Sequence, residues 1–166
     1  MPAQPFHIRR RVTETVDRAL TEKEIWFVAT GAKEPGAFGM RTLLDEYGDD
    51  LADAWIINID TVGAGTTAFI TDEGVTRRKT SDRRLASQAR RTARENDLPV
   101  RGRSYRAVRT DAGLALTRGL KTMSVMAFDI NNRLANWHWH TDTIEGIQEP
   151  TLAQSTDFVT ALVRDL

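Results

Sequence analysis

Apolar and polar positions along the chain predict strands that alternate with helices. Short apolar runs rich in branched and aromatic residues predict buried strands over 25–30, 54–60, 66–71 and 121–128. Apolar residues at helical spacing predict helices over 9–20, 40–48, 81–96, 111–119 and from Pro150 to the C-terminus. Because these strands are continuously apolar, we predict that both faces of the sheet are covered. The fold is then α/β, a three-layer αβα sandwich with a mixed, mostly parallel sheet.

Helix-capping and turn residues indicate where these elements end. Gly48 is expected to end its helix, and Ser81 or Asp82 to cap the start of the helix over 81–96. Asp72, Glu73 and Gly74 read as the turn that follows the strand over 66–71. The polar stretch 131–143 is predicted to be a long loop.

Composition narrows the class of protein. The 166 residues suit one ordinary domain, and a chain that is 40% hydrophobic and 28% charged can form a core. The absence of cysteine excludes disulfides, thiolate zinc sites and cysteine nucleophiles. No apolar run approaches the roughly 20 residues of a membrane helix, and the N-terminal stretch has no signal-peptide core. We therefore expect a cytoplasmic protein without a membrane partner.

Charge is balanced in total but segregated along the chain. Lys and Arg number 23, as do Asp and Glu, yet residues 77–109 carry 12 basic groups against three acidic ones. Such a block could contact nucleic acid, or it could be the solvated face of a helix and its following loop. No aromatic residue lies among these arginines before Tyr105, and stacking on single strands needs aromatics. Nucleic acid is therefore an unlikely partner.

Polar residues that could bind a metal follow three of the predicted strands. Glu34 follows the strand over 25–30, Asp60 ends the strand over 54–60, and His138 and His140 lie in the loop after the last strand. Ligands of open α/β sheets bind beyond the carboxyl ends of strands, and carboxylates with imidazole suit zinc or a harder metal. Each residue also has a simpler reading, as a solvated glutamate, a turn aspartate and histidines packed beside tryptophan.

Three stretches carry a resemblance to a known family. They are WFVATGAKEPGAFGMRTLL (26–44), WIINIDTVGAG (55–65) and NWHWHTDTIEGI (136–147). In this order they resemble the C-terminal part of the co-catalytic di-zinc aminopeptidases, peptidase family M28, whose members include bacterial leucyl aminopeptidases. The resemblance implies a zinc aminopeptidase-like α/β domain over 25–166, a truncated zinc-exopeptidase-like fold lacking its usual N-terminal part. Residues 1–24 then form an unassigned N-terminal helical segment.

The resemblance also implies roles for particular residues. Glu34 matches the ligand of one zinc, Asp60 the ligand of the other, and His138 the C-terminal histidine ligand. Asp111 resembles a substrate-pocket residue outside the metal shell. Lys33 stands where the family has its general-base glutamate, which takes a proton from water and delivers it to the leaving amine.

The resemblance fails at two other motifs of the family. Its His-X-Asp metal motif and the segment with the bridging aspartate have no counterpart before Trp26, since neither His7 nor Asp17 stands in a matching context. The family binds two zinc ions, and we expect this chain to bind one zinc weakly or none. A sheet without those segments is expected to have an open edge, which favours a homo-oligomer or a complementing chain.

Two functions follow as hypotheses. The first is a zinc-dependent aminopeptidase, a hydrolase of peptide N-terminal residues, that is incomplete or catalytically impaired as this chain. The alternative is a non-catalytic pseudoenzyme or binding module that retains the pocket. In that case the Lys33 ammonium would neutralise Glu34 and Asp60, which otherwise repel each other as like charges.

Overall fold

A computed structural model describes residues 6–8, 24–107 and 109–166. It divides into two units, residues 1–54 and 55–166, and we describe each by itself. The helix predicted over 9–20 lies outside the described residues. The expected domain boundary after residue 24 stays a prediction. Within the described residues, no helix is both long enough and apolar enough to cross a membrane.

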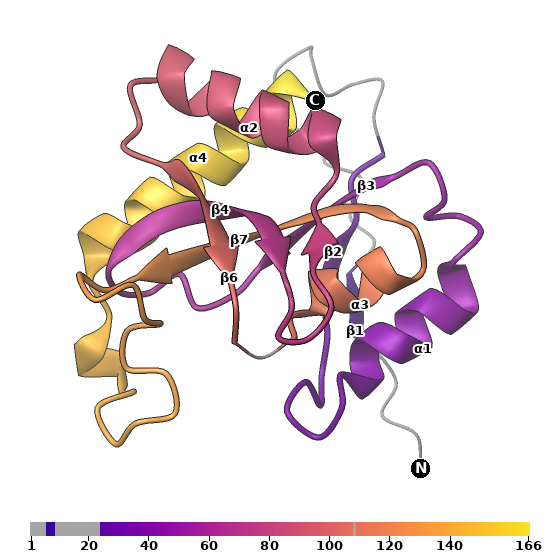
Figure 1. Cartoon of the computed structure of the whole chain (residues 1–166), viewed down its shortest axis with the longest axis horizontal. Helices are drawn as coiled ribbons and strands as arrows, with labels where there is room; N and C mark the ends of the chain where they lie inside the picture. The colour runs from indigo at the N-terminus through magenta and orange to yellow at the C-terminus, as the bar shows by residue number, and fades with distance from the viewer. Residues whose placement is uncertain (1–5, 9–23, 108) are drawn as a thin grey trace. The chain divides into compact units, whose positions relative to one another are not determined.

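The described residues of the first unit form two strands and a helix, which Figure 1 labels β1, β2 and α1. Strand β1 (Phe6–Ile8) pairs antiparallel with β2 (Phe27–Ala29), and helix α1 spans Phe38–Tyr47. Met40, Leu43 and Leu44 are the buried large side chains of α1. The prediction that 25–30 is a buried strand is wrong in one respect, because all three residues of β2 are exposed.

The second unit is built on a five-stranded sheet. Its strands are β3 (Trp55–Ile59), β4 (Thr66–Glu73), β5 (Lys79–Thr80), β6 (Arg101–Tyr105) and β7 (Lys121–Phe128). The order is β3-β7-β4-β5, and β6 also pairs with β4. The β3–β7 and β4–β6 pairs are parallel, whereas β4 pairs antiparallel with both β5 and β7.

The sheet is therefore mixed, as predicted, but the prediction that it is mostly parallel is wrong. A parallel connection needs a crossover of about a dozen residues or more. Only residues 60–65 join β3 to β4, so β4 runs opposite to β3. Gly65 (φ 95°) makes this connection possible, because a Cβ there would lie 2.3 Å from the carbonyl oxygen of Phe128.

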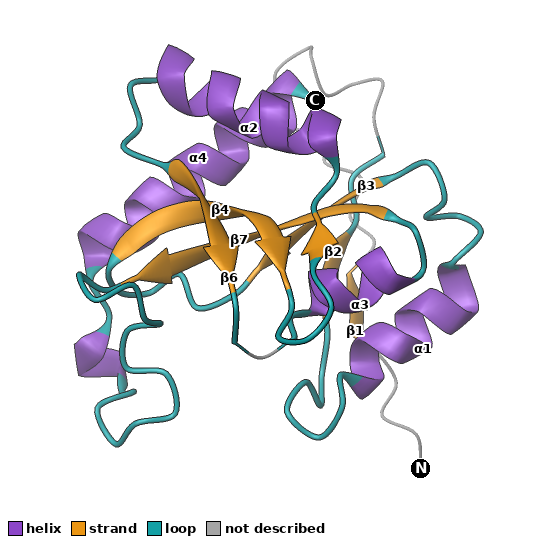
Figure 2. Ribbon diagram, in the orientation of Figure 1, coloured by secondary structure: helices purple, strands orange, loops and turns teal. Residues whose placement is uncertain are grey.

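Helices cover both faces of this sheet, which confirms the three-layer αβα arrangement (Figure 2). Helices α2 (Arg83–Glu95) and α4 (Glu149–Asp165) lie on one face, and α3 (Asp111–Thr117) lies on the other. Phe69 and Phe158 stack at the centre of the α2/α4 face with ring centroids 6.2 Å apart. The larger apolar cluster forms around them from the following buried residues: Leu85, Ala86, Ala89, Ala93, Val100, Met123, Val125 and Leu162.

Three elements differ from the predicted ones. Strand β4 extends two residues further than expected, so Asp72 and Glu73 belong to the sheet rather than to a turn. Strands β5 and β6 lie in the arginine-rich region that was read as a helix and its following loop. The sequence of β6, RGRSY, is polar because its residues are mostly exposed, so no apolar pattern marks this strand.

Strand β3 lies at the end of the sheet. In the described part of the chain it pairs only with β7. Trp55 is 41% exposed and Ile59 is 54% exposed, so the prediction of a fully buried strand is wrong here. An apolar strand covered on one side only is typical of a sheet edge that other strands can pair with.

Candidate functional site

The turn between β2 and α1 is closed by its own backbone. The amide groups of Gly36 and Ala37 both donate to the carbonyl oxygen of Lys33, at 3.1 and 2.7 Å, and the Gly39 amide donates to the Gly31 carbonyl at 2.9 Å. A Cβ on Gly39 would lie 2.5 Å from the Gly31 nitrogen, so only glycine permits this approach. The turn predicted from GAKEPGAFG is confirmed, and it is a tight connection between a strand and a helix.

This turn presents the two charged residues that the sequence singled out. Lys33 is half-buried and Glu34 is exposed. The Lys33 carbonyl is held by two amide donors, which fixes the backbone from which both side chains project. An ammonium group and a carboxylate thus occupy consecutive positions at the carboxyl end of β2. Both residues belong to the first unit, whereas the other predicted site residues belong to the second.

Asp60 leaves the carboxyl end of β3. Its amide donates to the Val125 carbonyl at 3.1 Å, which extends the parallel pairing of β3 with β7 by one bond. Thr61 adopts a left-handed conformation (φ 53°) and donates its hydroxyl to Asp60 Oδ1 at 2.9 Å. The side chain of Asp60 is half-buried. The structure therefore has Asp60 both ending a strand and bonding within its own turn.

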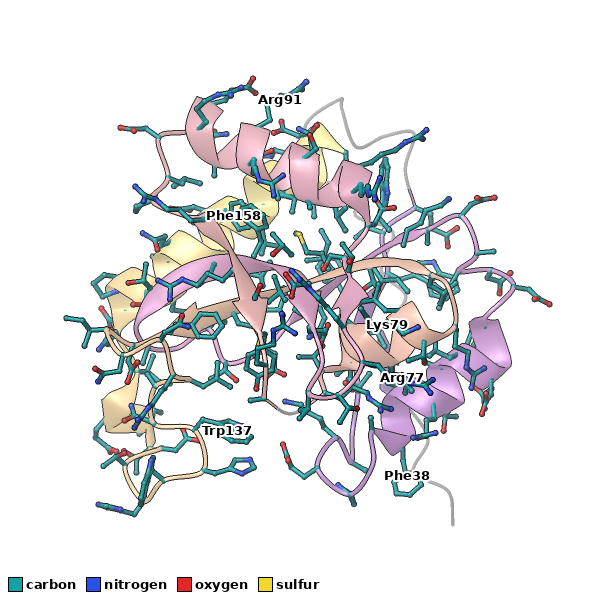
Figure 3. The ribbon with its side chains drawn as sticks, viewed as in Figure 1. Phe38, Arg77, Lys79, Arg91, Trp137 and Phe158 are labelled. Carbon is teal, nitrogen blue, oxygen red and sulfur yellow. The ribbon has the colours of Figure 1, made fainter. Side chains whose placement is uncertain are left out.

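His138 lies in the loop that follows β7. It adopts a left-handed conformation (φ 58°), and its exposed ring stacks on Trp137 with centroids 3.9 Å apart and planes at 21°. His140 meets Trp139 edge-on. Figure 3 shows Trp137 in this loop, away from helices α2 and α3. The packing of histidine beside tryptophan, one of the two readings of the sequence, is thus present.

The zinc expected from the resemblance can be tested against the described side chains. Among residues 6–8, 24–107 and 109–166, no group of three or more histidine, aspartate or glutamate side chains could hold a metal ion. Protein zinc sites use at least three such ligands. Glu34 belongs to the first unit and Asp60 and His138 to the second, so these three residues as joint zinc ligands stay a prediction.

A buried polar network that the sequence did not reveal lies under α3. Glu73 is 2% exposed. Its carboxylate accepts the Thr110 hydroxyl, at 2.7 Å to Oε2, and the Thr110 amide at 3.2 Å. The hydroxyls of Thr110 and Ser124 are 3.1 Å apart, and Asn58 Nδ2 donates to Ser124 Oγ at 3.1 Å. The network joins three strands of the sheet to the start of α3.

Counting protons gives this network a direction. The single hydroxyl proton of Thr110 goes to Glu73 when that carboxylate is ionised, so the Ser124 hydroxyl must donate to Thr110. Asn58 then donates to Ser124. Every donor in this hydrogen-bond network points toward Glu73, and this orientation stabilises the negative charge of the carboxylate.

Two other effects oppose that stabilisation. Burial raises the pKa of Glu73 above its ordinary value, the bonds from Thr110 lower it, and the nearby negative charge of Asp60 raises it. The net direction is upward. Asp60 is therefore electrostatically coupled to a buried carboxylate. Sequence reasoning missed Glu73 because it placed the residue in a turn; two acidic residues directly after an apolar run were the available signal.

Asp111 is the first residue of α3 and is 6% exposed. Thr110 caps this helix, since its hydroxyl accepts the amide of Gly113 at 3.1 Å. A carboxylate in the first turn is favoured by the partial positive charge of the helix N-terminus. The substrate contact expected for Asp111 from the resemblance stays a prediction.

A family model described as peptidase family M28 matches residues 7–163. No curated protein matches the chain.

Solved structures with a similar fold include two bacterial aminopeptidases. The LapA aminopeptidase of Legionella pneumophila has a TM-score of 0.70 at 14% identity, covering 85% of this chain and 38% of LapA. The zinc aminopeptidase BSAP of Bacillus subtilis has a TM-score of 0.66 at 23% identity, covering 86% of this chain and 35% of BSAP. A glutaminyl cyclase from an Acidobacteriales bacterium has a TM-score of 0.57 at 16% identity, covering 76% of this chain and 44% of the cyclase. The chain thus shares their fold over well under half of their length.

Proposed function

The chain belongs to peptidase family M28, and from this membership we propose that it binds the N-termini of peptides and is catalytically impaired as this chain alone. One observation carries the proposal. The turn that resembles the family's catalytic turn keeps the carboxylate of Glu34 but has Lys33 in the position of the general base.

The chemistry of lysine explains the impairment. An ammonium group has three donors and no acceptor. It cannot take a proton from an attacking water. When bound, zinc would polarise the scissile carbonyl and lower the pKa of that water. Even with zinc present, the proton would have no acceptor at residue 33.

Carboxylates remain to recognise a peptide N-terminus. Glu34 in the first unit and Asp60 in the second each offer a carboxylate at a strand end. A free α-amino group is an ammonium near neutral pH, with a pKa of about 8, and a carboxylate binds it by a charge-assisted hydrogen bond. The proposed ligand is therefore a peptide with an unblocked N-terminus.

A second candidate function is favoured by the exposed apolar residues of β3. Trp55 and Ile59 lie on an edge strand, which is suited to pairing with another strand. A second copy, or a complementing chain of the same family, could supply side chains that complete the active site. Hydrolysis would then require the complex.

Binding is tested by calorimetric titration of a tetrapeptide with a free N-terminus and of the same peptide with an acetylated N-terminus. We expect the acetylated peptide to bind at least tenfold more weakly, because it has no N-terminal ammonium group for a carboxylate to bind. Glu34→Gln and Asp60→Asn should each weaken the binding of the peptide with a free N-terminus. Glu95→Gln on α2 is the matched control. Equal binding of both peptides would show that N-terminal recognition is wrong.

Catalysis is tested with a leucyl reporter amide, with and without added zinc. We expect no hydrolysis above the blank by the native chain or by Lys33→Glu alone, and well under two zinc ions per chain by metal analysis. Activity of the native chain that a chelator abolishes would contradict the proposed impairment. Hydrolysis that appears only at high protein concentration would favour the complex instead.

A further inference from the structure

A pocket lies in the unit of residues 55–166, between the β4–β5 turn and α3. Its volume is about 550 Å³, within the roughly 300–1,000 Å³ of small-molecule sites. The side chains that matter for its chemistry line its wall: Glu73, Thr76, Arg77, Lys79, Arg109 and Thr117. Figure 3 shows Arg77 and Lys79 close to α3, on the side of the sheet away from α2. Nothing in the proposed peptide site uses these residues.

Two glycines bring the parts of this wall close together. Gly74 (φ 121°) turns the chain so tightly that a Cβ there would lie 2.2 Å from the Arg77 carbonyl oxygen. The antiparallel register then places Lys79 directly opposite Glu73, so both side chains lie on the same face of the sheet. At Gly113 a Cβ would lie 2.8 Å from Glu73 Oε2 and 2.9 Å from Arg109 Cγ. Glycine therefore lets α3 pack against both residues.

The pocket has an excess of positive charge. Arg77, Lys79 and Arg109 contribute three cations, against the one carboxylate of Glu73. Among the described residues, no carboxylate forms an ion pair with Arg77 or Lys79, whereas the neighbouring Arg78 is paired with Asp72. The Glu73 oxygens already accept hydrogen bonds from Thr110. The remaining charge of about plus two is complementary to a dianion.

We propose that this pocket binds a small phosphate monoester. The two guanidinium groups offer donors in the planar, forked geometry that suits phosphate oxygens, and the ammonium group adds a compact positive charge. A phosphate monoester carries a charge of about −1.5 to −2 at pH 7, which matches the excess charge of the wall. The volume exceeds that of a bare phosphate ion, so it leaves room for the organic group of the ester.

The test is calorimetric titration of the full chain with glycerol phosphate. This ester has no ammonium group, so it is a poor ligand for the carboxylates of the proposed peptide site, and failure of one proposal leaves the other standing. We expect the double variant Arg77→Gln/Lys79→Gln to bind at least tenfold more weakly than the native chain. Both positions are on the β4–β5 turn or β5, outside the apolar core, so urea unfolding should show an intact fold.

Two controls make the result decisive. Arg91→Gln on α2 removes an exposed arginine outside the pocket (Figure 3) and should change the affinity less than twofold. An equal loss in Arg91→Gln would show that the ester senses only the overall charge, and an unchanged affinity in the double variant would show that the pocket is not the site. Succinate, a dicarboxylate dianion, should bind at least fivefold more weakly than glycerol phosphate; tighter binding of succinate would overturn the phosphate assignment.

Discussion

Asp72 and Glu73 are neighbours at the end of β4, and both are 2% exposed. The pKa of Asp72 is nevertheless lowered, whereas the pKa of Glu73 is raised. Arg78 donates two hydrogen bonds to Asp72, at 2.8 and 2.9 Å, and this pairing is the main reason why the pKa of Asp72 falls to about 2. Glu73 lies on the α3 side, where Thr110 is its hydrogen-bond donor among the described residues, and its pKa rises because burial dominates.

The difference shows that the partners of a buried carboxylate decide which way its pKa moves: the bonds from Arg78 outweigh burial at Asp72, whereas the bonds from Thr110 do not outweigh it at Glu73. Residues at consecutive positions of a strand point to opposite faces. A bulge lies between Ile70 and Asp72, and from it one carboxylate reaches an arginine and Ser104, while the other reaches a hydroxyl network. The first arrangement suits a structural anchor. The second holds a carboxylate that is costly to ionise beside Asp60 and the β4–β5 pocket.

The largest effect is expected from Asp72→Asn. The substitution keeps the size of the side chain but removes the charge that Arg78 and Ser104 bind. A pKa lowered from 3.8 to about 2 corresponds to about 2 kcal/mol of stability at neutral pH, so we expect the free energy of unfolding to fall by about that amount. Urea unfolding at pH 7 measures it.

The matched control for this variant is Glu95→Gln. Glu95 forms an exposed ion pair with Arg91 on α2, and exposed pairs contribute roughly 0 to 1 kcal/mol. A loss in Asp72→Asn no larger than that of the control would show that the arginine pair does not anchor β4.

The pH dependence of stability should separate the two carboxylates. The folded-state pKa of Asp72 is below its unfolded value of 3.8, so its contribution is complete above pH 3.8 and is lost as the pH falls through about 2. Glu73 behaves in the opposite way. Its folded-state pKa is above 4.5, so its contribution is complete below pH 4.5 and is lost as the pH rises through the folded value.

Urea unfolding at a series of pH values measures both contributions. The difference between the native chain and Asp72→Asn should shrink from about 2 kcal/mol at pH 7 toward zero near pH 2. A difference that stays constant with pH would mean that the substitution acts through packing and not through charge.

A smaller effect of the opposite sign is expected from Glu73→Gln. The amide oxygen of glutamine can still accept the Thr110 hydroxyl, while the desolvated charge is removed. At pH 7 the free energy of unfolding should rise, by less than about 1 kcal/mol, and below pH 4.5 the gain should disappear. A loss of stability at pH 7 would indicate that Arg109 and Lys79 need the negative charge.

The smallest effect is expected from Arg78→Lys. Lysine keeps the positive charge but cannot donate two parallel hydrogen bonds to Asp72. The Arg78 side chain is 59% exposed, so water replaces part of what is lost, and the expected destabilisation is below about 1 kcal/mol. Thermal unfolding of Arg78→Lys and Arg78→Gln measures the loss of stability in each variant, and we expect the larger loss in Arg78→Gln. A larger loss in Arg78→Lys would contradict the pairing geometry.

The sequence by itself determined the features that local signals encode. The bounds of β7 were predicted as 121–128 and are found there. Ser81 or Asp82 was predicted as a helix cap, and it is the Asp82 carboxylate that accepts the Leu85 amide at 2.9 Å. The turn GAKEPGAFG and the three family motifs were also visible, because each depends on residues within a few positions of one another. The family followed from the order of those motifs.

Only the tertiary structure decided the antiparallel pairing of β4 and the environment of its two acidic residues. Thr110 and Ser104, which bind Glu73 and Asp72, are 37 and 32 positions away along the chain. No local pattern can report which of two adjacent carboxylates will meet an arginine and which will meet a hydroxyl. That assignment arises when β4, β6 and α3 pack together, since packing fixes both the donors that are present and the water that is excluded.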